Sequence, residues 1–424
     1  MRKYSEYKNS GIPWIGNIPS HWNIERGKNV LTLLDRPIMD TDDVITCFRD
    51  GEVTLRKNRR EEGFTLSFQE IGYQGIEPGD LVVHGMDGFA GAIGVSDSRG
   101  KATPVLNVMD SIHNKRFLMY YLRTAAYKDV FMSLSTGIRV RSCDLRWNKL
   151  SVFPFVLPER EEQDRIAEYI DDKLLQINSI ISEAKASIEE YKAWKASIIY
   201  EAVTKGLDPN VEMRNSGVEW IGKIPSHWKC TKVRQIAEFI NGFAFQSDDL
   251  GSEGKYPVVK IGDIQDGKVN FMSCQCTSLN EELSGVQIKK EDILLAMSGA
   301  TVGKVGYVFD MPLKNSYINQ RVGIYRMKET PKFYFYIFSQ PFYVEYALLN
   351  ASGTAQPNIS TESAKNFFVP IPPLNERETI CKYLDKICPN IDEVIADKKA
   401  LIEDLESYKK SLIFEVVTGK RKVL

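Results

Sequence analysis

The feature that most constrains this chain is an internal repeat, because its 424 residues carry the same segments twice. Residues 9–22 read NSGIPWIGNIPSHW and residues 215–228 read NSGVEWIGKIPSHW, with identity at 11 of 14 positions. Residues 166–204 align with residues 380–418 without a gap. Self-similarity of this kind is the signature of a repeated structural unit, and it predicts two similar halves.

A third, weaker match lies inside each half. GDLVVHGMDGFAGAIG (79–94) aligns with EDILLAMSGATVGKVG (291–306), and its apolar pattern agrees better than its letters. The interiors as a whole, about 31–150 and 237–367, are not copied. Two similar frames around two unlike interiors suggest two similar tasks on two different targets.

The aligned segments 166–204 and 380–418 predict long helices. Their apolar residues follow alternating steps of three and four, beginning with Ile166, Ile170, Leu174 and Ile177 in the first copy and with Ile380, Leu384, Cys388 and Ile391 in the second. This spacing places one narrow apolar stripe on each helix, as in a coiled-coil seam, and the two helices are the obvious partners for each other.

The two predicted helices differ at one position. Residues 162–203 as one helix would span roughly 63 Å at about 1.5 Å per residue. In the second copy, Pro389 stands where the first has Leu175, and we expect it to break or kink the helix, which leaves a straight part over about 390–417. Lys195 and Lys409 interrupt the two seams at equivalent positions.

The globular regions predict mixed structure in which short strands dominate. Runs such as LVVHG, GAIGVS, YPVVKIGDI, DILLAM, KVGYVF and VGIYRM are rich in β-branched residues and bounded by Gly, Asp or Ser, and helical stretches over 115–131 and 331–349 follow them. The expected fold class is therefore α+β, with two pseudo-symmetric mixed α/β domains joined by two long helices. The expected segments are 1–157, 158–205, 206–370 and 371–424.

Composition excludes several classes of protein. No apolar run reaches the length of a membrane span and no signal peptide begins the chain, so we expect a cytoplasmic protein with no membrane partner. The seven cysteines are scattered and odd in number, which favours reduced thiols. The net charge of −1 does not by itself indicate nucleic acid, so any DNA contact must come from local patches or from a partner.

Two motifs resemble chemistry and fail on inspection. Between Gly299 and Gly303 stand three residues instead of four, and Val305 instead of Ser or Thr follows Lys304, so this is a glycine-rich turn and no phosphate loop. The repeated IPSHW is interpreted as a tryptophan-anchored turn that packs the chain's entry onto its domain. No methyltransferase tetrapeptide and no metal-ligand spacing appears in the sequence, so we expect neither a catalytic site nor a metal nor a cofactor in this chain.

The candidate DNA contacts are basic and amide side chains in turns. Arginine can pair with guanine and Asn or Gln with adenine, while lysine more often contacts phosphate. The candidates are Arg56, Lys57, Arg59, Arg60, Arg139, Arg141 and Arg146 in the first half, and Lys255, Lys260, Lys304, Arg321, Gln356 and Asn358 in the second.

Two other readings remain open at this point. The chain could be a nuclease or methyltransferase with a coiled-coil arm, which methylation by the purified chain alone would establish. It could also be a scaffold that binds only proteins, and equal affinity for every DNA sequence would favour that reading.

The motifs together resemble the specificity subunits of type I restriction–modification enzymes over essentially the whole chain. The resemblance rests on WIGxIPSHW in each half, on NGFAFQSDDL, YPVVKIGDIQDG, EDILLAMSGATVGKVGYV and NQRVGIYR in the second half, and on VPIPPLNERETICKYLDKI before the second helix. The first half keeps FPFVLPEREEQDRIAEYID, while IRVRS replaces TAQPN and MDGFAG replaces SGATVG.

The resemblance implies a role in reading double-stranded DNA. Segments 1–157 and 206–370 would be target-recognition domains, each reading one half of a split sequence, and the two helices would pair antiparallel as a ruler. Two modification subunits would bind S-adenosylmethionine and methylate adenine. Restriction subunits would supply ATP- and Mg-dependent translocation and cleavage.

Overall fold

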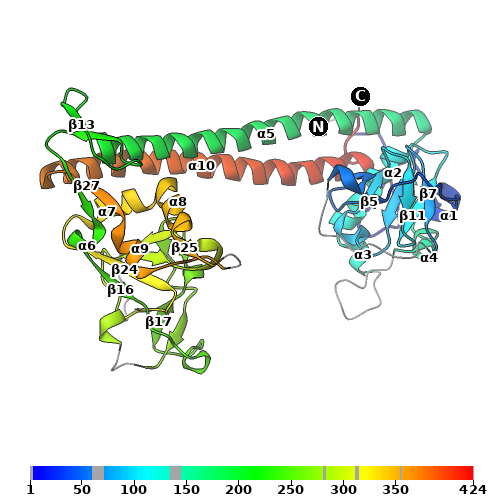
Figure 1. The fold of residues 1–424 in the computed structure, drawn as a ribbon. Helices are drawn as coiled ribbons and strands as arrows, with labels where there is room; N and C mark the ends of the chain where they lie inside the picture. Colours follow the sequence, from blue (N-terminus) through cyan, green and yellow to red (C-terminus); the bar gives the residue numbers. More distant parts are fainter. Residues whose placement is uncertain are drawn as a thin grey trace. The chain divides into compact units, whose positions relative to one another are not determined.

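The computed structural model describes residues 3–59, 71–133, 145–279, 283–310, 315–353 and 356–423. The chain divides into two compact units (Figure 1): the first combines Met1–Lys185 with Lys399–Leu424, and the second is Ala186–Lys398. Each unit contains a globular lobe and a portion of each long helix. The four segments expected from the sequence stay a prediction, since the units combine pieces of them.

The long helices are α5 (Arg160–Lys205) and α10 (Leu374–Val417), and in each unit a stretch of one lies beside a stretch of the other (Figure 1). Contacts in the second unit show their direction. Lys195 Nζ lies 2.7 Å from Asp392 Oδ2, whereas Tyr191, earlier in α5, contacts Lys398, later in α10. Residue numbers fall on one helix as they rise on the other, so the pairing is antiparallel. Long helices together with the sheets of the two lobes confirm the expected α+β class.

The seam lysines occupy equivalent places in the two units. In the second unit Lys195 donates to Asp392, and in the first Lys409 Nζ donates to Asn178 Oδ1 at 2.9 Å. The gapless alignment of the two helices matches Lys195 with Lys409 and Asn178 with Asp392, so it relates both members of one pair to those of the other. The sequence repeat therefore reappears as a repeated contact between the two helices.

The predicted break at Pro389 is wrong. α10 is continuous through Pro389 and begins at Leu374 instead of near residue 390. The proline is exposed, while Leu384, Cys388 and Ile391 beside it are buried and hold the helix in place. The carbonyl that loses its hydrogen bond belongs to Asp385, an exposed residue, so water can replace the missing N–H.

The two lobes share one sheet topology although their interiors differ in sequence. In the first lobe the strand order is β4-β11-β8-β9, and in the second β16-β24-β21-β22 is extended by β19-β18. The two central hairpins, β8–β9 and β21–β22, are the segments of the third, weaker match. The strands are β4 (Thr32–Leu33), β8 (Leu81–His84), β9 (Ile93–Val95), β11 (Leu106–Asp110), β16 (Ala237–Asn241), β18 (Ile264–Gln265), β19 (Lys268–Val269), β21 (Ile293–Ala296), β22 (Val305–Tyr307) and β24 (Val322–Met327).

Small sheets frame each lobe and repeat between the halves. The hairpin β1–β2 has its counterpart in β13–β14, and the pair β3–β12, which joins the lobe's entry to the strand before α5, has its counterpart in β15–β27. Their bounds are β1 (Tyr7–Asn9), β2 (Asn17–Pro19), β3 (Asn23–Arg26), β12 (Pro154–Leu157), β13 (Met213–Asn215), β14 (Lys223–Pro225), β15 (Lys229–Lys232) and β27 (Phe368–Ile371).

The remaining elements lie within the interiors or immediately before them. The predicted helical stretches appear as α2 (Lys115–Tyr127) with α3 (Val130–Ser133), and as α7 (Pro331–Phe338) with α8 (Pro341–Leu349), which Pro341 separates. The other strands are β5 (Ile45–Cys47), β6 (Val53–Leu55), β7 (Gln74–Ile76), β10 (Gly100–Ala102), β17 (Tyr256–Val259), β20 (Gln275–Thr277), β23 (Tyr317–Ile318), β25 (Ala351–Ser352) and β26 (Asn358–Ile359), and the short helices are α1 (Gly27–Val30), α4 (Trp147–Leu150), α6 (Val233–Ile236) and α9 (Thr361–Asn366).

The repeated IPSHW is a tryptophan-anchored turn, as predicted. Trp22 and Trp228 are buried, and their Nε1 atoms donate to Glu162 Oε2 at 3.3 Å and to Glu376 Oε2 at 2.9 Å. The preceding histidines reach the same carboxylates, since His21 Nε2 lies 3.0 Å from Glu162. Each turn is thus fixed to the first residues of a long helix.

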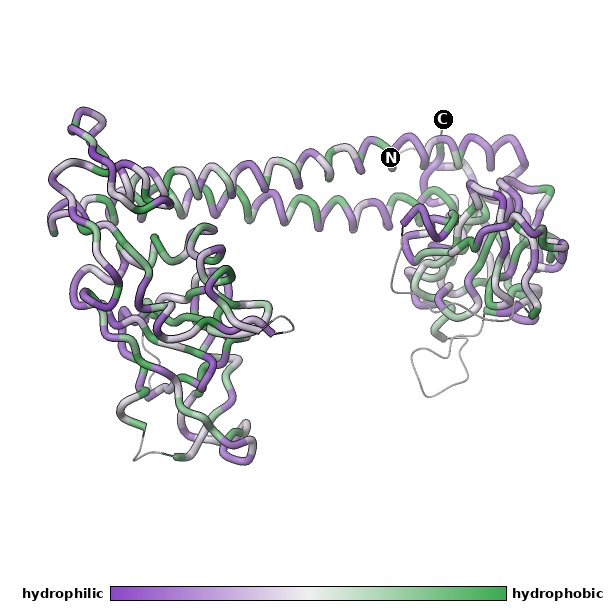
Figure 2. Tube along the Cα trace, in the orientation of Figure 1, coloured by the Kyte–Doolittle hydropathy of each residue, from purple (hydrophilic) through white to green (hydrophobic). Residues whose placement is uncertain are grey.

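The end of each long helix completes the lobe that the other helix starts from. Figure 2 shows hydrophobic residues interspersed with hydrophilic ones along both helices, and at the end of α10 Leu412, Val416 and Val417 are buried in the same apolar core as Trp22. Gly419, with a φ of +71°, packs so closely on Pro19 and Trp22 that a side chain would collide with the proline ring. The first lobe therefore depends on residues 399–423.

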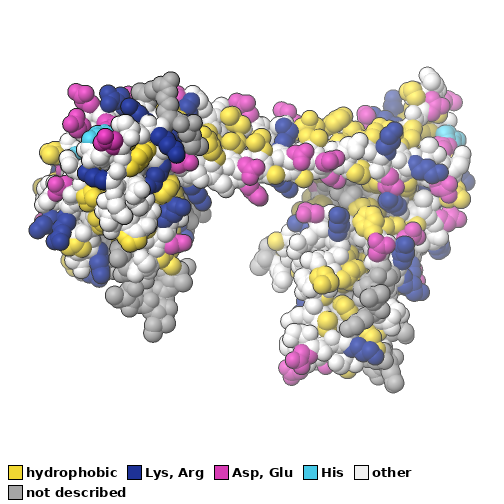
Figure 3. Space-filling view, turned by 180° about the vertical axis from the view of Figure 1, so that it is seen from behind, with side chains coloured by type: hydrophobic (Ala, Val, Ile, Leu, Met, Phe, Trp, Pro, Cys, Tyr) yellow, Lys and Arg dark blue, Asp and Glu magenta, His cyan; other side chains and the backbone are white. Residues whose placement is uncertain are grey.

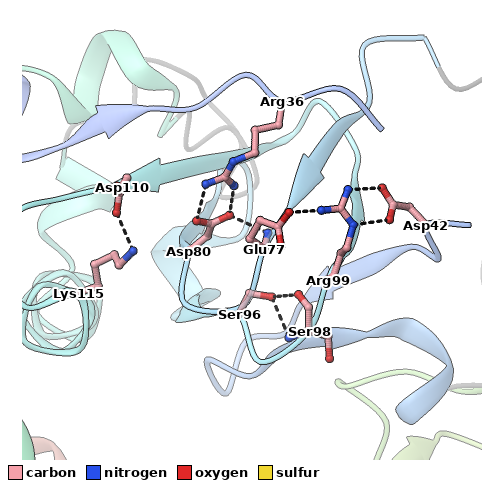
Figure 4. A network of polar contacts seen from close by, with 9 residues as sticks. All are labelled: Arg36, Asp42, Glu77, Asp80, Ser96, Ser98, Arg99, Asp110 and Lys115. Carbon is pink, nitrogen blue, oxygen red and sulfur yellow. Dashed lines mark hydrogen bonds and ion pairs between the residues drawn. The ribbon is translucent and has the colours of Figure 1, made fainter. Parts of the chain in front are cut away.

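In each lobe a buried aspartate forms an ion pair with an arginine from another segment. Figure 4 shows Arg36 bonded to Asp80 and, beside it, Arg99 between Glu77 and Asp42. In the second lobe Asp292, the counterpart of Asp80 in the repeat, accepts from Arg326 Nε at 2.9 Å. Although the two arginines come from unrelated segments, the buried carboxylate keeps a cationic partner in both lobes.

Three features can be checked among the described residues: the state of the cysteines, metal-binding groups and membrane-spanning helices. Six cysteines described there are free thiols, and Cys143 lies outside the described residues. Within the same ranges no group of three or more His, Cys, Asp or Glu side chains is placed to hold a metal ion. None of the helices described has the length and apolar character needed to cross a bilayer.

Candidate nucleic-acid interface

Several segments of the second lobe meet where β21 ends. The Met297 N–H donates to the Arg321 carbonyl at 2.9 Å, and the Ile359 N–H donates to the Met297 carbonyl at 2.9 Å. One residue earlier, the Ala296 N–H donates to the Lys304 carbonyl at 2.9 Å. The backbone thus brings candidate residues from three separate segments to one end of the sheet.

The end of β17 lies at the same place. The Asn319 N–H donates to the Val259 carbonyl at 3.0 Å, which sets Lys260 beside the segment that leads to Arg321. Gln356 adjoins Pro357, whose carbonyl accepts from the Gly299 N–H at 2.9 Å. We call Lys260, Lys304, Arg321, Gln356 and Asn358 the second-lobe face.

The side chains of the second-lobe face suit contact with DNA. Lys304, Arg321 and Gln356 are exposed and Asn358 is half-buried, while Lys260 Nζ donates to Gln275 Oε1. Together they offer three cations and two amide groups, the types that contact phosphates and adenine edges. A groove of about 520 Å³, lined by Lys304 and by the turn from Ile261 to Gly267, borders the face.

The structure separates Lys255 from this group. Lys255 precedes β17, whereas Lys260 follows that strand, and the Lys255 Nζ lies over the ring of Tyr256, 5.2 Å from the ring centroid. Of the six second-half candidates, five are therefore brought together and one lies at the other end of its strand.

The glycine-rich segment before Lys304 forms a turn, as predicted. Gly299–Thr301 is one turn of 3₁₀ helix, and both Gly299 and Gly303 have positive φ. At Gly303, a side chain would come within 3.0 Å of the Val344 backbone, so both φ and space require glycine.

In the first lobe, the RKNRR cluster is partly neutralised by its own lobe. Lys57 Nζ lies 2.5 Å from Asp43 Oδ2, and its hydrogen bond holds the pKa of that carboxyl below the usual range. Arg59 bonds Asp50 at 2.7 Å and Glu52 at 2.9 Å, and Arg56 Nε donates to the Thr46 hydroxyl at 3.2 Å. A phosphate would compete with these acids. Arg60 lies outside the described residues.

Arg146 stands at the position that corresponds to the second-lobe face. The preceding Leu145 N–H donates to the Gly85 carbonyl at 2.9 Å, which places Arg146 beside the turn Gly88–Ala90, the counterpart of Gly299–Thr301. Arg139 and Arg141 lie outside the described residues.

Sequence reasoning missed Arg49. Its guanidinium lies 2.9 Å from Asp87 Oδ1 beside the same turn. We call Arg49 and Arg146 the first-lobe face. The only sequence signal for Arg49 is its partner Asp87 in MDGFAG, and only the fold brings these two distant residues together.

On the side seen in Figure 3, charge does not form a single field over either lobe. Figure 3 shows lysine and arginine side chains interspersed with acidic ones on the side seen there. Binding to a polyanion through these lobes would therefore depend on particular side chains more than on bulk attraction.

Comparison with known proteins gives a consistent assignment. Residues 225–404 match the family model described as the type I restriction modification DNA specificity domain. The chain is 26% identical over 336 residues to the type I restriction enzyme MjaVIII specificity subunit of Methanocaldococcus jannaschii, covering 76% of each protein. It is 22% identical over 361 residues to the EcoBI specificity subunit of Escherichia coli, covering 81% of this chain and 74% of the relative.

Solved structures agree on the fold. A chain from a study of complex assembly and conformational transition in the type I R-M system superposes with a TM-score of 0.70 at 14% identity, covering 94% of this chain and 98% of that chain. The crystal structure of the HsdS subunit from Thermoanaerobacter tengcongensis gives a TM-score of 0.51 at 16% identity, with 95% and 98% covered. Residues 225–404 thus carry the type I restriction modification DNA specificity domain, and over most of its length the chain is similar to type I restriction–modification specificity subunits.

Proposed function

We propose that this chain reads a split, asymmetric DNA target, one half-site per lobe, and directs adenine methylation and restriction by partner subunits without a catalytic site of its own. One observation carries the proposal. The two lobes share sheet order and frame, yet the equivalent turns carry different side chains, with Gln356 and Asn358 beside one and Arg49 and Arg146 beside the other.

The difference between the faces implies unlike half-sites. Amide side chains pair with the N6 and N7 edge of adenine, and arginine pairs with the O6 and N7 edge of guanine. Each well-placed pair is worth about 1–3 kcal/mol of discrimination against a wrong base. Two such faces would read two different short sequences.

The long helices support a fixed spacing between the half-sites. α5 is one continuous helix of 46 residues that begins in the first unit and ends in the second, roughly 69 Å at about 1.5 Å per residue. Readers joined by a stiff element meet their half-sites at one separation and one helical phase.

Partners would supply what this chain lacks. Two modification subunits would bind S-adenosylmethionine and transfer its methyl group to adenine, and restriction subunits would use ATP and Mg. They would also supply phosphate contacts, since the chain itself carries a net charge of −1.

Methyladenine mapping tests the proposal. The chain is co-purified with its modification subunit and incubated with genomic DNA and S-adenosylmethionine, and the methylated sites are sequenced. We expect a split motif with unlike halves. Replacing both Gln356 and Asn358 by Ala should relax the bases of one half-site, with a loss of methylation of at least tenfold at the native motif.

The matched control is Gln287→Ala, an amide residue whose backbone carbonyl accepts from Arg326, the partner of Asp292 just before β21 begins, and which therefore lies at the opposite end of β21 from the second-lobe face. It should leave the motif unchanged. Methylation by the purified chain without its partner, or equal binding to every sequence when the partner is present, would refute the proposal.

A further inference from the structure

The two unlike lobes hold the long helices through the same five helix positions. These are Glu162, Ile166, Ala167, Ile170 and Asp171 in α5, and Glu376, Ile380, Cys381, Leu384 and Asp385 in α10. At about 100° per residue, the glutamate and the aspartate project from opposite sides of the helix, and the three apolar residues lie between them. All six apolar side chains are buried.

The glutamate side is the contact with IPSHW already described. In the first unit Glu162 also accepts a hydrogen bond from the Tyr4 hydroxyl at 2.7 Å, and burial, with this bond, raises the pKa of Tyr4. In the second unit Glu376 lies 2.7 Å from His227 Nε2. Each glutamate therefore fixes one edge of its lobe to the helix.

The aspartate side repeats with equal fidelity. Asp171 accepts from the Tyr120 hydroxyl at 2.5 Å and pairs with Arg116 at 2.5 Å. Burial and the bond to Asp171 raise the pKa of Tyr120, so the hydroxyl keeps its proton and donates.

The second lobe makes the same contact with a different cation. Asp385 accepts from the Tyr336 hydroxyl at 2.5 Å and pairs with Lys332 at 2.7 Å. The donors come from α2 in one lobe and α7 in the other, where both sequences read Arg or Lys, Phe, two residues, Tyr. This short pattern is kept although the two interiors differ over most of their sequence.

The geometry indicates what these contacts do. The apolar strip between the acids resists separation of lobe and helix, but apolar burial is not directional. Charge-assisted hydrogen bonds are directional, and two of them on opposite sides of one helix oppose rotation of the lobe about it. Successive base pairs are about 35° apart around DNA, so a small rotation of a lobe would shift the spacing that it reads.

We infer that Asp171 with Tyr120, and Asp385 with Tyr336, are positioning residues that set the angle of each lobe on its helix and thereby the length of spacer that the subunit accepts. The inference rests on the proposed function and adds the residues that enforce the spacing. It requires no contact between these residues and DNA.

The test uses the full chain with its modification subunit and duplexes that carry the mapped half-sites. The spacer is the native one, one base pair shorter, or one base pair longer. The native protein should methylate the native spacer at least fiftyfold faster than the altered ones. The double variant Asp385→Ala with Tyr336→Phe should narrow this ratio to fivefold or less, with unchanged base preference in each half-site.

Two further variants separate positioning from folding. Glu189→Gln removes an ion pair with Lys192 on the exposed surface of α5 and should keep the native ratio. Lys332→Met removes the cation but keeps the bond from Tyr336 to Asp385, and should give an intermediate ratio. The melting temperature of each variant is measured to establish that the variant is folded.

The outcomes are distinct. If the double variant keeps the native ratio, or loses activity equally at all three spacers, the positioning role is refuted while the proposed function stands. If the native protein itself shows no preference among spacers, the proposed function fails.

Discussion

His84 illustrates how a single side chain can shape the turn beside a candidate DNA face. Its Nδ1 accepts hydrogen bonds from the Met86 N–H at 3.2 Å and the Asp87 N–H at 2.9 Å, so this nitrogen must be unprotonated. Burial lowers the pKa of His84, although the neighbouring Asp87 raises it in part. The sequence gives no sign of this role, because both hydrogen-bond donors to His84 are backbone N–H groups and not particular side chains.

The arrangement predicts a pH dependence of stability. Because the folded-state pKa lies below the unfolded value of about 6.5, the unfolded chain takes up the proton first as pH falls. The contribution of His84 is therefore present above the unfolded pKa and is lost as pH falls toward the folded pKa. His84→Asn places an oxygen near the position of Nδ1 that does not titrate in this range. Its melting temperature should fall less than that of the native chain between pH 7.5 and 5.5, and an equal fall would contradict this role.

At the scale of elements, periodicity predicted more than residue type did. Steps of three and four identified α5 and α10, because this pattern follows from burial of one helix face. Short β-branched runs identified β8, β9, β21, β22 and β24 of the central sheets, while the other strands of these sheets were not singled out. The effect of Pro389 was mispredicted, since the packing of Leu384, Cys388 and Ile391 outweighs one lost hydrogen bond.

Some parts of the site were beyond sequence reasoning. The acids that neutralise Lys57 and Arg59 lie on neighbouring strands and turns, and only tertiary structure pairs them. The basic–Phe–x–x–Tyr pattern shared by α2 and α7 is visible in the sequence, but a helix that packs on a sheet is rich in aromatic residues, so the pattern alone does not indicate a contact with a long helix. The turn that gathers Lys304, Arg321 and Gln356 depends on strand order, which a single sequence does not give.

The continuity of α10 leads to a prediction about Pro389. Pro389→Ala restores the backbone hydrogen bond to Asp385, and we expect it to stabilise the chain by about 2 kcal/mol, from about 3 kcal/mol for the helix interior less up to about 1 kcal/mol for the freer unfolded chain. Urea unfolding measures the change. Leu175→Ala, at the equivalent exposed position of α5, is the control and should change stability by less than about 0.5 kcal/mol. A destabilised Pro389→Ala variant would mean that the helix requires the proline geometry.

At the scale of the whole molecule, the long helices and the small sheets around each lobe repeat between the halves, whereas the interiors of the lobes differ. Each unit grips a long helix at the same positions, whereas the faces near Arg146 and Gln356 belong to one lobe each. Because the frame is common to both, we expect an interior to be replaceable without disturbing the other lobe.

Exchange of residues 31–150 for the interior of another specificity subunit tests this expectation. The exchanged interior must carry a basic residue and a tyrosine that can reach Asp171. Methyladenine mapping should then show one half-site changed and the other retained. A change in both half-sites would count against independent lobes.

The closing of the first lobe by residues 399–423 has a consequence for biosynthesis. The ribosome makes residues 1–185 before the second unit, yet the side chains of Leu412, Val416 and Val417 that seal the first lobe against water are made after that unit. The second unit, a contiguous stretch of chain, can fold while translation continues. A nascent chain that stops before residue 399 therefore leaves the apolar surface around Trp22 exposed to water.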